Sequence, residues 1–309
     1  MGSLPSMMPR LRHGWGSSDR IDRWAWRAGT CFDAYGVRVG VRFNDPALLE
    51  RLGPHLPPGW QPCASSDVDQ IFSVWVSPRG ARARTVGRVY VGAQRRALAK
   101  DLEQAFEVLE SEIRQGVAAA ARGRTFVHAG VVGWHGRAIL VPGRSRSGKT
   151  TLVAELVKSG AVYYSDEFAV LDRRGRVHPF AKSLSIREGG CARHEIVRRK
   201  RAEDFGGFCG VKPLPVALVV LASHRPGAEW QPVTLTRGQA VLEMLAHTVP
   251  ARLRPEASLL ALERAVARAT VLQGERGEAT AVAARLLEHV REPAGTSRVG
   301  AGAEGEGMR

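Results

Sequence analysis

The segment "GRSRSGKTT" at residues 143–151 constrains the fold of this chain more than any other. Gly143, Gly148, Lys149 and Thr150 fit the pattern G-x-x-x-x-G-K-[ST], in which glycines let backbone N–H groups curl around an anion. The segment follows the apolar run "RAILVP" and overlaps the start of an amphipathic run, "TLVAELVKSG". A strand therefore enters the loop and a helix leaves it, which predicts an α/β fold with a phosphate site at the start of the helix.

This loop is expected to bind a nucleotide. Lys149 would reach the outer phosphates, and Thr150 would hold Mg²⁺ through its hydroxyl. A Gly/Ser turn before an ordinary helix is the alternative, and it leaves the Gly-Lys-Thr sequence at the helix start unexplained. The residues expected to contact the nucleotide are Gly143, Arg144, Ser145, Arg146, Ser147, Gly148, Lys149, Thr150 and Thr151.

Two adjacent acids, Asp166 and Glu167, end the strand-like run "AVYYS" that follows the expected helix. In a parallel strand–helix–strand unit, the end of the second strand lies beside the phosphate loop. Adjacent strand residues point to opposite faces, so only one of the two acids is expected to face the ligand. A carboxylate there can hold Mg²⁺ or take a proton from an attacking hydroxyl. Solvated acids in a turn are the alternative.

A hairpin is expected just before the loop, because "TFVHAGVVGWHGRAILVPG" contains two apolar runs joined by His135-Gly136. In a two-residue turn Trp134 pairs with Arg137, and His128 then lies opposite Gly143. A histidine beside the phosphates can orient the acid or contact the γ-phosphate. A core histidine bonded to backbone fits the spacing equally well.

Composition divides the rest of the chain into four parts. Residues 1–24 and 293–309 are rich in Gly, Ser, Pro and charge, and are expected to be flexible tails. Residues 25–123 form a small α+β module, and residues 124–292 form the domain that contains the loop. In the module, we expect strands in "YGVRVGVRF", "IFSVWVSPRG" and "GRVYVGA", and a short helix over 46–57.

Helical periodicity dominates two regions. A long helix is expected over 97–123, with one apolar face made by Leu98, Leu102, Phe106, Leu109 and Ile113. In the second domain, a helix over 149–159 ends before Gly160, where a glycine is typical. The run "PVALVVLAS" predicts a central strand at 215–223. Three helices are expected to close the chain, over 237–248, 256–270 and 278–291.

The net charge of +15 raises the question of nucleic acid. The densest basic run, residues 193–204, lacks interleaved aromatic residues, so a solvated helix face is favoured over a nucleic-acid site. The four cysteines have no CxxC spacing, no apolar run is long enough for a membrane helix, and the first residues lack the apolar core of a signal peptide. These features favour a cytoplasmic protein that does not enter membranes.

These segments together resemble the HPr kinase/phosphorylase family and its shorter relatives, including kinases associated with peptide-tailoring gene clusters. The resemblance covers roughly residues 125–290. It is specific in "VHAGVVGWHGRAILVPGRSRSGKTT" and "GAVYYSDEF", and weaker in "PFAKSLSIREGG". It implies a kinase core related to phosphoenolpyruvate carboxykinase that uses ATP and Mg²⁺ to phosphorylate a serine hydroxyl of a peptide or protein. Family members assemble into rings, which implies a homo-oligomer.

The resemblance also implies roles for single residues. Asp166 matches the general base, His128 the histidine that assists it, and Arg187 the arginine that contacts phosphate. Glu167 replaces a second aspartate, so the candidate metal ligands are Thr150, Asp166 and Glu167.

The sequence departs from the family pattern at two positions. Ser185 stands where the family has a glutamate, and Glu188 stands where it has a glycine, so neither a second metal ligand nor the reverse phosphorylase reaction is implied. The amino-terminal module does not resemble that of the HPr enzymes, so HPr itself is not expected as the substrate. A regulatory module that binds or slowly hydrolyses ATP, and a small-molecule kinase, remain as alternatives.

Overall fold

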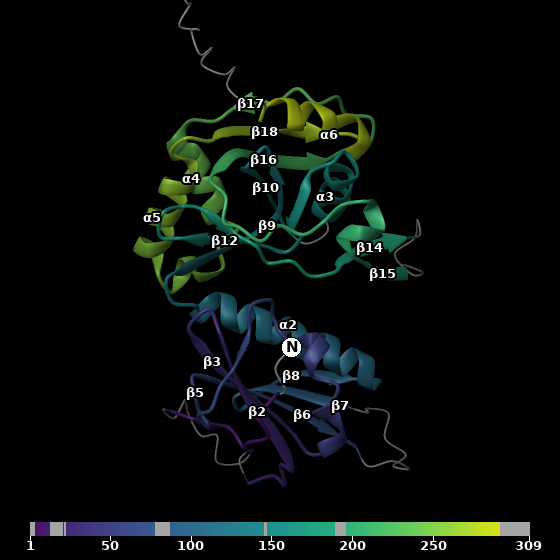
Figure 1. Ribbon diagram of the computed structural model, residues 1–309, viewed down its shortest axis with the longest axis vertical. Helices are drawn as coiled ribbons and strands as arrows, with labels where there is room; N and C mark the ends of the chain where they lie inside the picture. Colours follow the sequence, from purple (N-terminus) through teal and green to yellow (C-terminus); the bar gives the residue numbers. More distant parts are fainter. Residues whose placement is uncertain are drawn as a thin grey trace, which may run out of the picture.

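The computed structural model describes residues 4–12, 21, 23–77, 87–144, 147–188 and 196–290, with the backbone alone at 187–188 and 196–197. These residues form a mixed α/β protein with several mixed sheets and five α-helices (Figure 1). The expected tail at 293–309 lies outside the described residues. In the part of the chain that is described, no helix has the length and apolarity needed to span a bilayer.

The amino-terminal sheet has six strands in the order β4-β2-β3-β6-β7-β8. Its strands are β2 (Ala28–Ala34), β3 (Val37–Phe43), β4 (Gln61–Pro62), β6 (Gln70–Val76), β7 (Gly87–Val91) and β8 (Gln94–Ala99). The strands expected in "YGVRVGVRF", "IFSVWVSPRG" and "GRVYVGA" are confirmed as β3, β6 and β7. A parallel pair, β1 (Arg10–Leu11) with β5 (Asp67–Val68), packs beside it.

Helix α2 (Leu102–Ala120) lies between the two halves of the molecule (Figure 1). Its buried side chains include Phe106, Leu109 and Ile113, as the periodicity predicts. The expected start at residue 97 is wrong, because residues 94–99 form β8 and leave Leu98 half exposed. The helix begins after Asp101, whose carboxylate accepts a hydrogen bond from the backbone N–H of Gln104 at 2.8 Å and so caps the helix.

The short helix expected over 46–57 is also wrong. Two 3₁₀ helices, η1 (Pro46–Leu48) and η2 (Gly53–His55), occupy this stretch. Gly53 and Pro54 are the first two residues of η2, and they prevent one continuous helix because glycine disfavours helix and proline lacks the N–H that a continuous helix requires.

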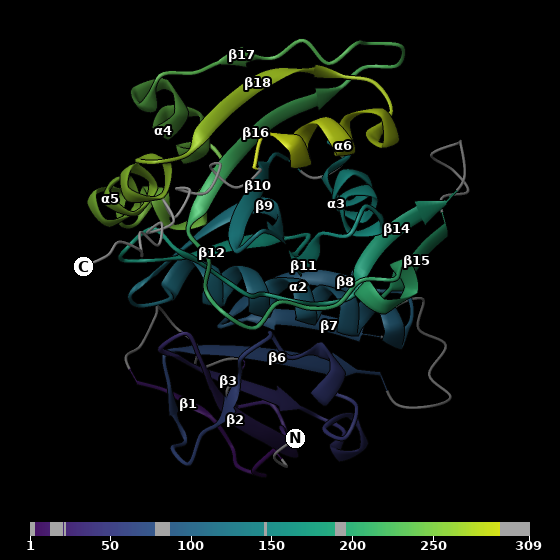
Figure 2. The ribbon, with the colours of Figure 1, turned by 45° about the horizontal axis from the view of Figure 1, so that its top comes forward.

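The large sheet has eight strands in the order β13-β12-β9-β10-β16-β18-β17, and β11 also pairs with β9. The bounds are β9 (Arg124–Trp134), β10 (Arg137–Pro142), β11 (Val162–Ser165), β12 (Phe168–Asp172), β13 (Val177–His178), β16 (Val216–His224), β17 (Val233–Thr234) and β18 (Thr270–Arg276). Helices α3 (Lys149–Lys158) and α6 (Ala279–Glu288) share one apolar cluster with this sheet. Helices α4 (Arg237–Leu245) and α5 (Pro255–Val266) share another, so the two pairs cover opposite faces (Figure 2).

The expected hairpin register is confirmed. Trp134 pairs with Arg137, and the Gly143 N–H donates to the His128 carbonyl at 3.1 Å. His135 and Gly136 both have positive φ, 46° and 72°, which a type I′ turn requires. Strands β10 and β11 are parallel, but β9 lies between them and pairs antiparallel with both.

The carboxyl-terminal part differs from expectation in three places. The run "AVYYSDEFAVLD" has a strand-like pattern throughout, but the chain forms two strands, β11 and β12, separated by Asp166-Glu167. The helix expected over 256–270 ends at Val266, and residues 270–276 form β18, which the sequence did not reveal. The basic run around 196–200 is strand β15 (Ile196–Lys200), paired with β14 (Leu184–Glu188), rather than a helix. The predicted central strand is confirmed as β16, which pairs parallel with β10 and β18.

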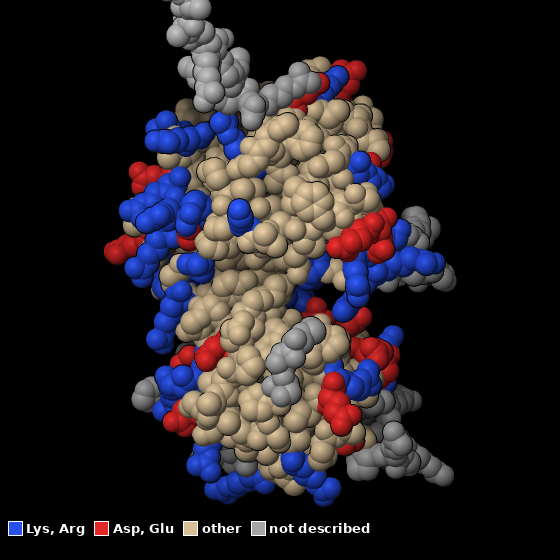
Figure 3. All heavy atoms as spheres, in the orientation of Figure 1, with Lys and Arg blue, Asp and Glu red and all other residues tan. Residues whose placement is uncertain are grey.

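The two halves share a hydrophobic core instead of meeting across a polar gap. Phe126 and Phe168 of the large sheet belong to the same buried cluster as Phe106 of α2. The Tyr35 ring meets the Phe126 ring edge to face, with 5.2 Å between the ring centres. In the face shown in Figure 3, Lys and Arg gather at the left edge of the upper half, over α4 and α5, and again at the right below β14 and β15.

Candidate functional site

The loop between β10 and α3 has the geometry that an anion cradle needs. Gly143 follows β10 directly, and a Cβ at this position would lie 2.6 Å from the Ser147 Oγ. Gly148 adopts a left-handed conformation with φ 82° and forms the N-cap of α3. The Ser147 hydroxyl thus occupies the space beside Gly143, and the positive φ of Gly148 favours glycine there. The start of α3 directs its positive dipole end toward the loop.

Lys149 lies over this loop. Its Nζ donates hydrogen bonds to the carbonyls of Gly143 at 2.7 Å and Arg144 at 2.6 Å. Burial lowers the pKa of Lys149, while the charges of Asp166 and Glu167 raise it. The ammonium group thus lies at the mouth of the loop, where the outer phosphates of a nucleotide would bind.

The remaining loop residues add hydrogen-bonding groups that bear on whether a phosphate group fits the loop. The Ser147 Oγ is buried and has no hydrogen-bond partner among the described residues, so a donor is available inside the cradle. Arg144 and Thr151 are exposed, whereas Ser145 and Arg146 lie outside the described residues. An unsatisfied hydroxyl, a lysine and a helix N-terminus form a donor set that fits a phosphate group.

Asp166 lies next to this loop, at the break between β11 and β12. Its carboxyl is buried, and Oδ2 lies 3.5 Å from both the Thr150 Oγ1 and the Ser185 backbone N. Burial raises the pKa of Asp166, although the nearby Lys182 charge lowers it. The strand-end acid and the hydroxyl of the loop therefore lie side by side, close enough to hold one cation between them after a small movement.

Tyr163 contributes a contact that the sequence did not reveal. Its hydroxyl lies 2.8 Å from the Lys182 carbonyl and 3.1 Å from the Asp166 Oδ1. The hydroxyl has one proton and can donate to only one of these acceptors at a time. When it donates to Asp166 it favours the ionised carboxyl and lowers the pKa of Asp166, against the larger effect of burial.

Glu167 has different partners from Asp166, and both acids lie in the bend between β11 and β12 rather than in a strand. The Glu167 Oε2 lies 2.9 Å from the Arg114 Nε of α2 and 3.0 Å from the Lys182 Nζ. These ion pairs join the large sheet to α2. No described contact joins Glu167 to Thr150, so the structure brings only Asp166 of the expected acidic pair to the loop.

His128 is in β9, which pairs with β10 on one side and with β12 on the other. It therefore lies between the loop that follows β10 and the acids that precede β12. On one side His128 is opposite Gly143, and on the other its Cα partner is Phe168 of β12. The imidazole packs against the Phe168 ring, with 4.7 Å between ring centres. Burial lowers the pKa of His128, while the Glu167 charge raises it. The buried surroundings favour a neutral imidazole.

Two further residues at the loop were missed by the sequence reasoning. The His247 carbonyl accepts a hydrogen bond from the His128 N–H at 2.8 Å, and burial together with Lys149 lowers the pKa of His247. Arg276, at the end of β18, is buried and donates from Nη2 to the Gly148 carbonyl at 3.0 Å. Parallel strands end at one edge of a sheet, so identifying β18 in the sequence would have placed Arg276 at the loop.

The expected metal site is incomplete in protein ligands. The described residues contain no group of three or more His, Cys, Asp or Glu side chains that could hold a metal. Magnesium commonly binds one or two carboxylates and takes its other ligands from phosphates and water, so Thr150 and Asp166 fit such a site when a nucleotide is bound. Arg187 has a described backbone in β14, paired with Val197, but its side chain lies outside the described residues.

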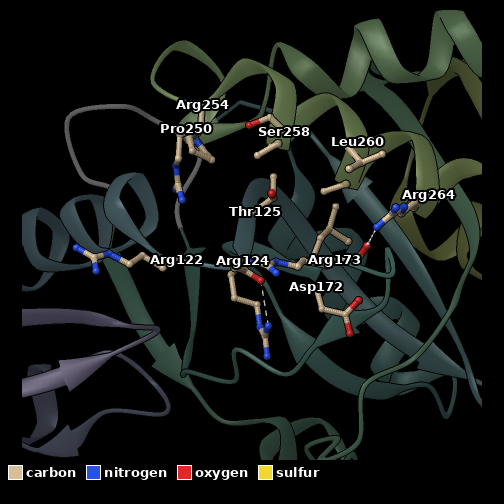
Figure 4. A pocket seen from close by; sticks show the side chains of 14 residues that line it. Arg122, Arg124, Thr125, Asp172, Arg173, Pro250, Arg254, Ser258, Leu260 and Arg264 are labelled. Carbon is tan, nitrogen blue, oxygen red and sulfur yellow. Dashed lines mark hydrogen bonds between the residues drawn. The ribbon is translucent and has the colours of Figure 1, made fainter.

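A cavity of about 300 Å³ lies away from the loop, among α5, the start of β9 and the end of β12 (Figure 4). Five arginines line it, and three of them donate to backbone carbonyls: Arg124 to Gly123, Arg254 to Ala119 and Ala121, and Arg264 to Arg173. Arg254 thereby caps the carboxyl end of α2, where a cation is favoured. No residue of the phosphate loop lines this cavity. The hydrogen bonds from Arg254 to the end of α2 join the two halves, so we interpret the lining of this cavity as structural.

The geometry thus brings together Gly143, Lys149, Thr150, Asp166 and His128 around one cradle. Searches against protein-family models and curated proteins find no match to this chain.

Proposed function

We propose that this protein is a Mg·ATP-dependent kinase that transfers the γ-phosphate to a serine hydroxyl of a peptide or protein. The fold in this proposal is a P-loop kinase core like that of HPr kinase and phosphoenolpyruvate carboxykinase, with a small amino-terminal α+β module. The observation that carries it is the buried Asp166 carboxyl, 3.5 Å from the Thr150 hydroxyl at the first turn of α3. A carboxyl in this position can act on a group that approaches the loop.

The loop residues would hold the nucleotide. Mg·ATP supplies the phosphoryl group and, through the metal, neutralises part of its charge. Lys149 would exchange its hydrogen bonds to loop carbonyls for phosphate oxygens, and the buried Ser147 hydroxyl would find its missing partner there. Arg276 keeps the Gly148 peptide in place from behind, so the cradle is formed before the ligand arrives.

Asp166 would accept the proton of the attacking hydroxyl. A general base works best when its pKa lies close to the working pH, and burial moves the pKa of Asp166 in that direction. The Tyr163 hydroxyl and the Ser185 N–H fix the orientation of the carboxyl. The His128 backbone N–H donates to the His247 carbonyl and so holds the strand next to the loop, and partial burial lowers the pKa of both imidazoles.

The resemblance alone supports the remaining parts of the proposal. Arg187 would offset charge on the transferred group, and Glu167 would complete the acidic pair through its ion pairs with Arg114 and Lys182. A cytoplasmic homo-oligomer belongs to the same proposal. A regulatory ATPase and a small-molecule kinase are the alternatives that the following experiment separates.

The test is to incubate the protein with ATP labelled at the γ-phosphate and an extract of the source cells, and to locate the label. We expect it on a polypeptide, with transfer abolished in Lys149→Ala and Asp166→Asn. Lys158→Ala, at the other end of α3 and paired with Glu155, is the matched control and should keep full transfer. Removing a cation from a phosphoryl-transfer site costs on the order of 10³-fold in rate.

Three results would contradict the proposal. Undiminished transfer by Asp166→Asn removes the base. Label in a low-mass fraction indicates a small-molecule kinase. Steady ATP hydrolysis without any labelled acceptor indicates a regulatory ATPase.

A further inference from the structure

A cavity of about 380 Å³ opens between the two halves of the protein. One wall is the loop at 53–60, which connects η2 to β4, and the other is the segment 181–185 that leads into β14. In Figure 3 the surface is hollowed at the right between the halves, and Lys and Arg atoms lie in the hollow. The volume lies within the roughly 300–1,000 Å³ typical of ligand pockets. It admits a short run of side chains but no folded domain.

This cavity adjoins the proposed base. Ser185 lines the cavity, and its N–H lies 3.5 Å from the Asp166 Oδ2. Lys182 also lines it, and its carbonyl accepts from the Tyr163 hydroxyl that contacts Asp166. The segment that forms the wall therefore also holds the acid. The phosphate loop meets the same carboxyl through Thr150, so Asp166 lies between the nucleotide cradle and the cavity.

The charge of the cavity is positive. Among its described lining residues are three cations, Arg114, Lys182 and Arg199, and one acid, Glu110. Burial by itself raises the pKa of Glu110, but the hydrogen bond with His55 and the charges of Arg114, Arg199 and Lys182 lower it to about 2. Glu110 is thus ionised and fully engaged by the surrounding cations, so it does not present an open negative charge to a ligand.

Arg199 is the cation best placed to meet a ligand. Its side chain is 48% exposed, and it makes one described ion pair, from Nη2 to the Glu110 Oε2 at 3.1 Å. A guanidinium has five N–H donors in a planar fork that suits a carboxylate. Glu110 holds one side of this fork in place and leaves the rest directed outward. Arg199 is therefore oriented in advance for a second carboxylate.

The opposite wall is apolar and rigid. Pro54, Pro57 and Pro58 fix the backbone of the loop, and Trp60 adds an aromatic face. A wall of this kind binds extended polypeptide with little loss of its own conformational freedom. A site for a small polar metabolite would need more hydrogen-bonding groups on this side.

We propose that this cavity is the acceptor site and that it takes an acidic segment of a polypeptide, with carboxylates beside the serine that is phosphorylated. The inference rests on the proposed function and adds the substrate class. Arg199 pairs with an acidic side chain, and Lys182, which also pairs with Glu167, adds positive charge beside it. Trp60 and the prolines support the peptide backbone, and the serine hydroxyl points toward Asp166. The amino-terminal module thus supplies half of the substrate site.

The test compares two short peptides that differ only in the residues next to one serine: aspartates in the first and asparagines in the second. Phosphate transfer and peptide binding are measured separately; binding uses fluorescent versions in which the serine is alanine. The variants are Arg199→Gln and Arg96→Gln. Arg96 is the matched control because it is similarly exposed and also pairs with a glutamate of α2, Glu112, but does not line the cavity.

We expect the acidic peptide to be preferred at least ~10-fold in kcat/KM, which corresponds to about 1.4 kcal/mol. Arg199→Gln should raise the KM for this peptide and weaken its binding, with an unchanged KM for ATP, while Arg96→Gln behaves like the unaltered protein. Transfer to both peptides without preference, or equal behaviour of the two variants, overturns the inference and leaves the kinase proposal intact. Arg199-dependent binding of the acidic peptide without transfer supports the acceptor surface and overturns the kinase proposal. If neither peptide binds and neither is phosphorylated, the inference is overturned.

Discussion

Gly148 offers the sharpest test of how the phosphate loop is held. A Cβ at this position would lie 2.5 Å from the Arg276 Nη2, and the residue has φ 82°. Alanine in the left-handed region costs about 1–2 kcal/mol. Displacing Arg276 also breaks its hydrogen bond to the Gly148 carbonyl, and a bond to a charged group contributes about 1.5–3 kcal/mol. Gly148→Ala is therefore expected to lower the free energy of unfolding by about 2.5–5 kcal/mol.

Gly160→Ala is the matched control, because Gly160 flanks the other end of the same helix and also has a positive φ of 97°. Its Cβ would meet only the Trp134 ring at 3.6 Å, an ordinary contact. The cost there is expected to be the backbone part alone, about 1–2 kcal/mol. The difference between the two variants thus isolates the contact with Arg276.

The assay is urea unfolding, in which a shift in midpoint at constant slope reports the change in stability. A second measurement is the rise in thermal midpoint on adding Mg·ATP, which follows from binding to the folded state. We expect this rise in Gly160→Ala and not in Gly148→Ala. Equal loss of stability in the two variants would refute the reasoning, since Arg276 would then not be packed against the loop.

Three more predictions follow from buried charges. Because burial raises the pKa of Asp166 in the folded state, ionisation of this carboxyl opposes folding at neutral pH. Asp166→Asn should therefore raise the thermal midpoint at pH 7, with a smaller gain near the unfolded pKa of about 3.9. A lower thermal midpoint of Asp166→Asn at pH 7 would contradict this. The pKa of Glu110 is lowered to about 2, so its contribution to folding stability is present above pH ~4.5 and is lost as the pH falls toward 2. Glu110→Gln should lower the free energy of unfolding by on the order of 3 kcal/mol at neutral pH, and the stability of this variant should change less between pH ~4.5 and 2. Arg254→Gln should lower stability by about 1.5–3 kcal/mol through loss of the cap on α2, whereas the exposed Arg252→Gln should leave the urea midpoint unchanged.

The sequence was most informative where function depends on neighbours along the chain. Turn residues at 135–136 set the hairpin register, and this register places His128 opposite Gly143. The glycine-rich segment correctly predicted a loop that leads from a strand directly into a helix. The side-by-side placement of Thr150 and Asp166 followed from the strand that succeeds α3.

Local patterns failed where two interpretations fit the same residues. The stretch at 97–99 continues the helical period of α2 but pairs as part of β8, because an edge strand was available and Asp101 caps the helix later. Strand β18 was hidden because "TVLQGER" follows an amphipathic helix without a strong turn signal. Its pairing with β16, whose residues precede it by about fifty positions, decided its conformation.

What the sequence determined by itself was the cradle: the loop, the strand before it, the helix after it and the acid beside it. Tertiary structure alone decided what surrounds that cradle. Arg276 reaches Gly148 across 128 positions and Arg114 reaches Glu167 across 53, so no local pattern could pair them. The physical reason is that glycine turns and strand alternation act between neighbours, whereas the Arg114–Glu167 ion pair and the Arg276–Gly148 hydrogen bond form only after α2 and β18 pack against the large sheet and remove water from both partners.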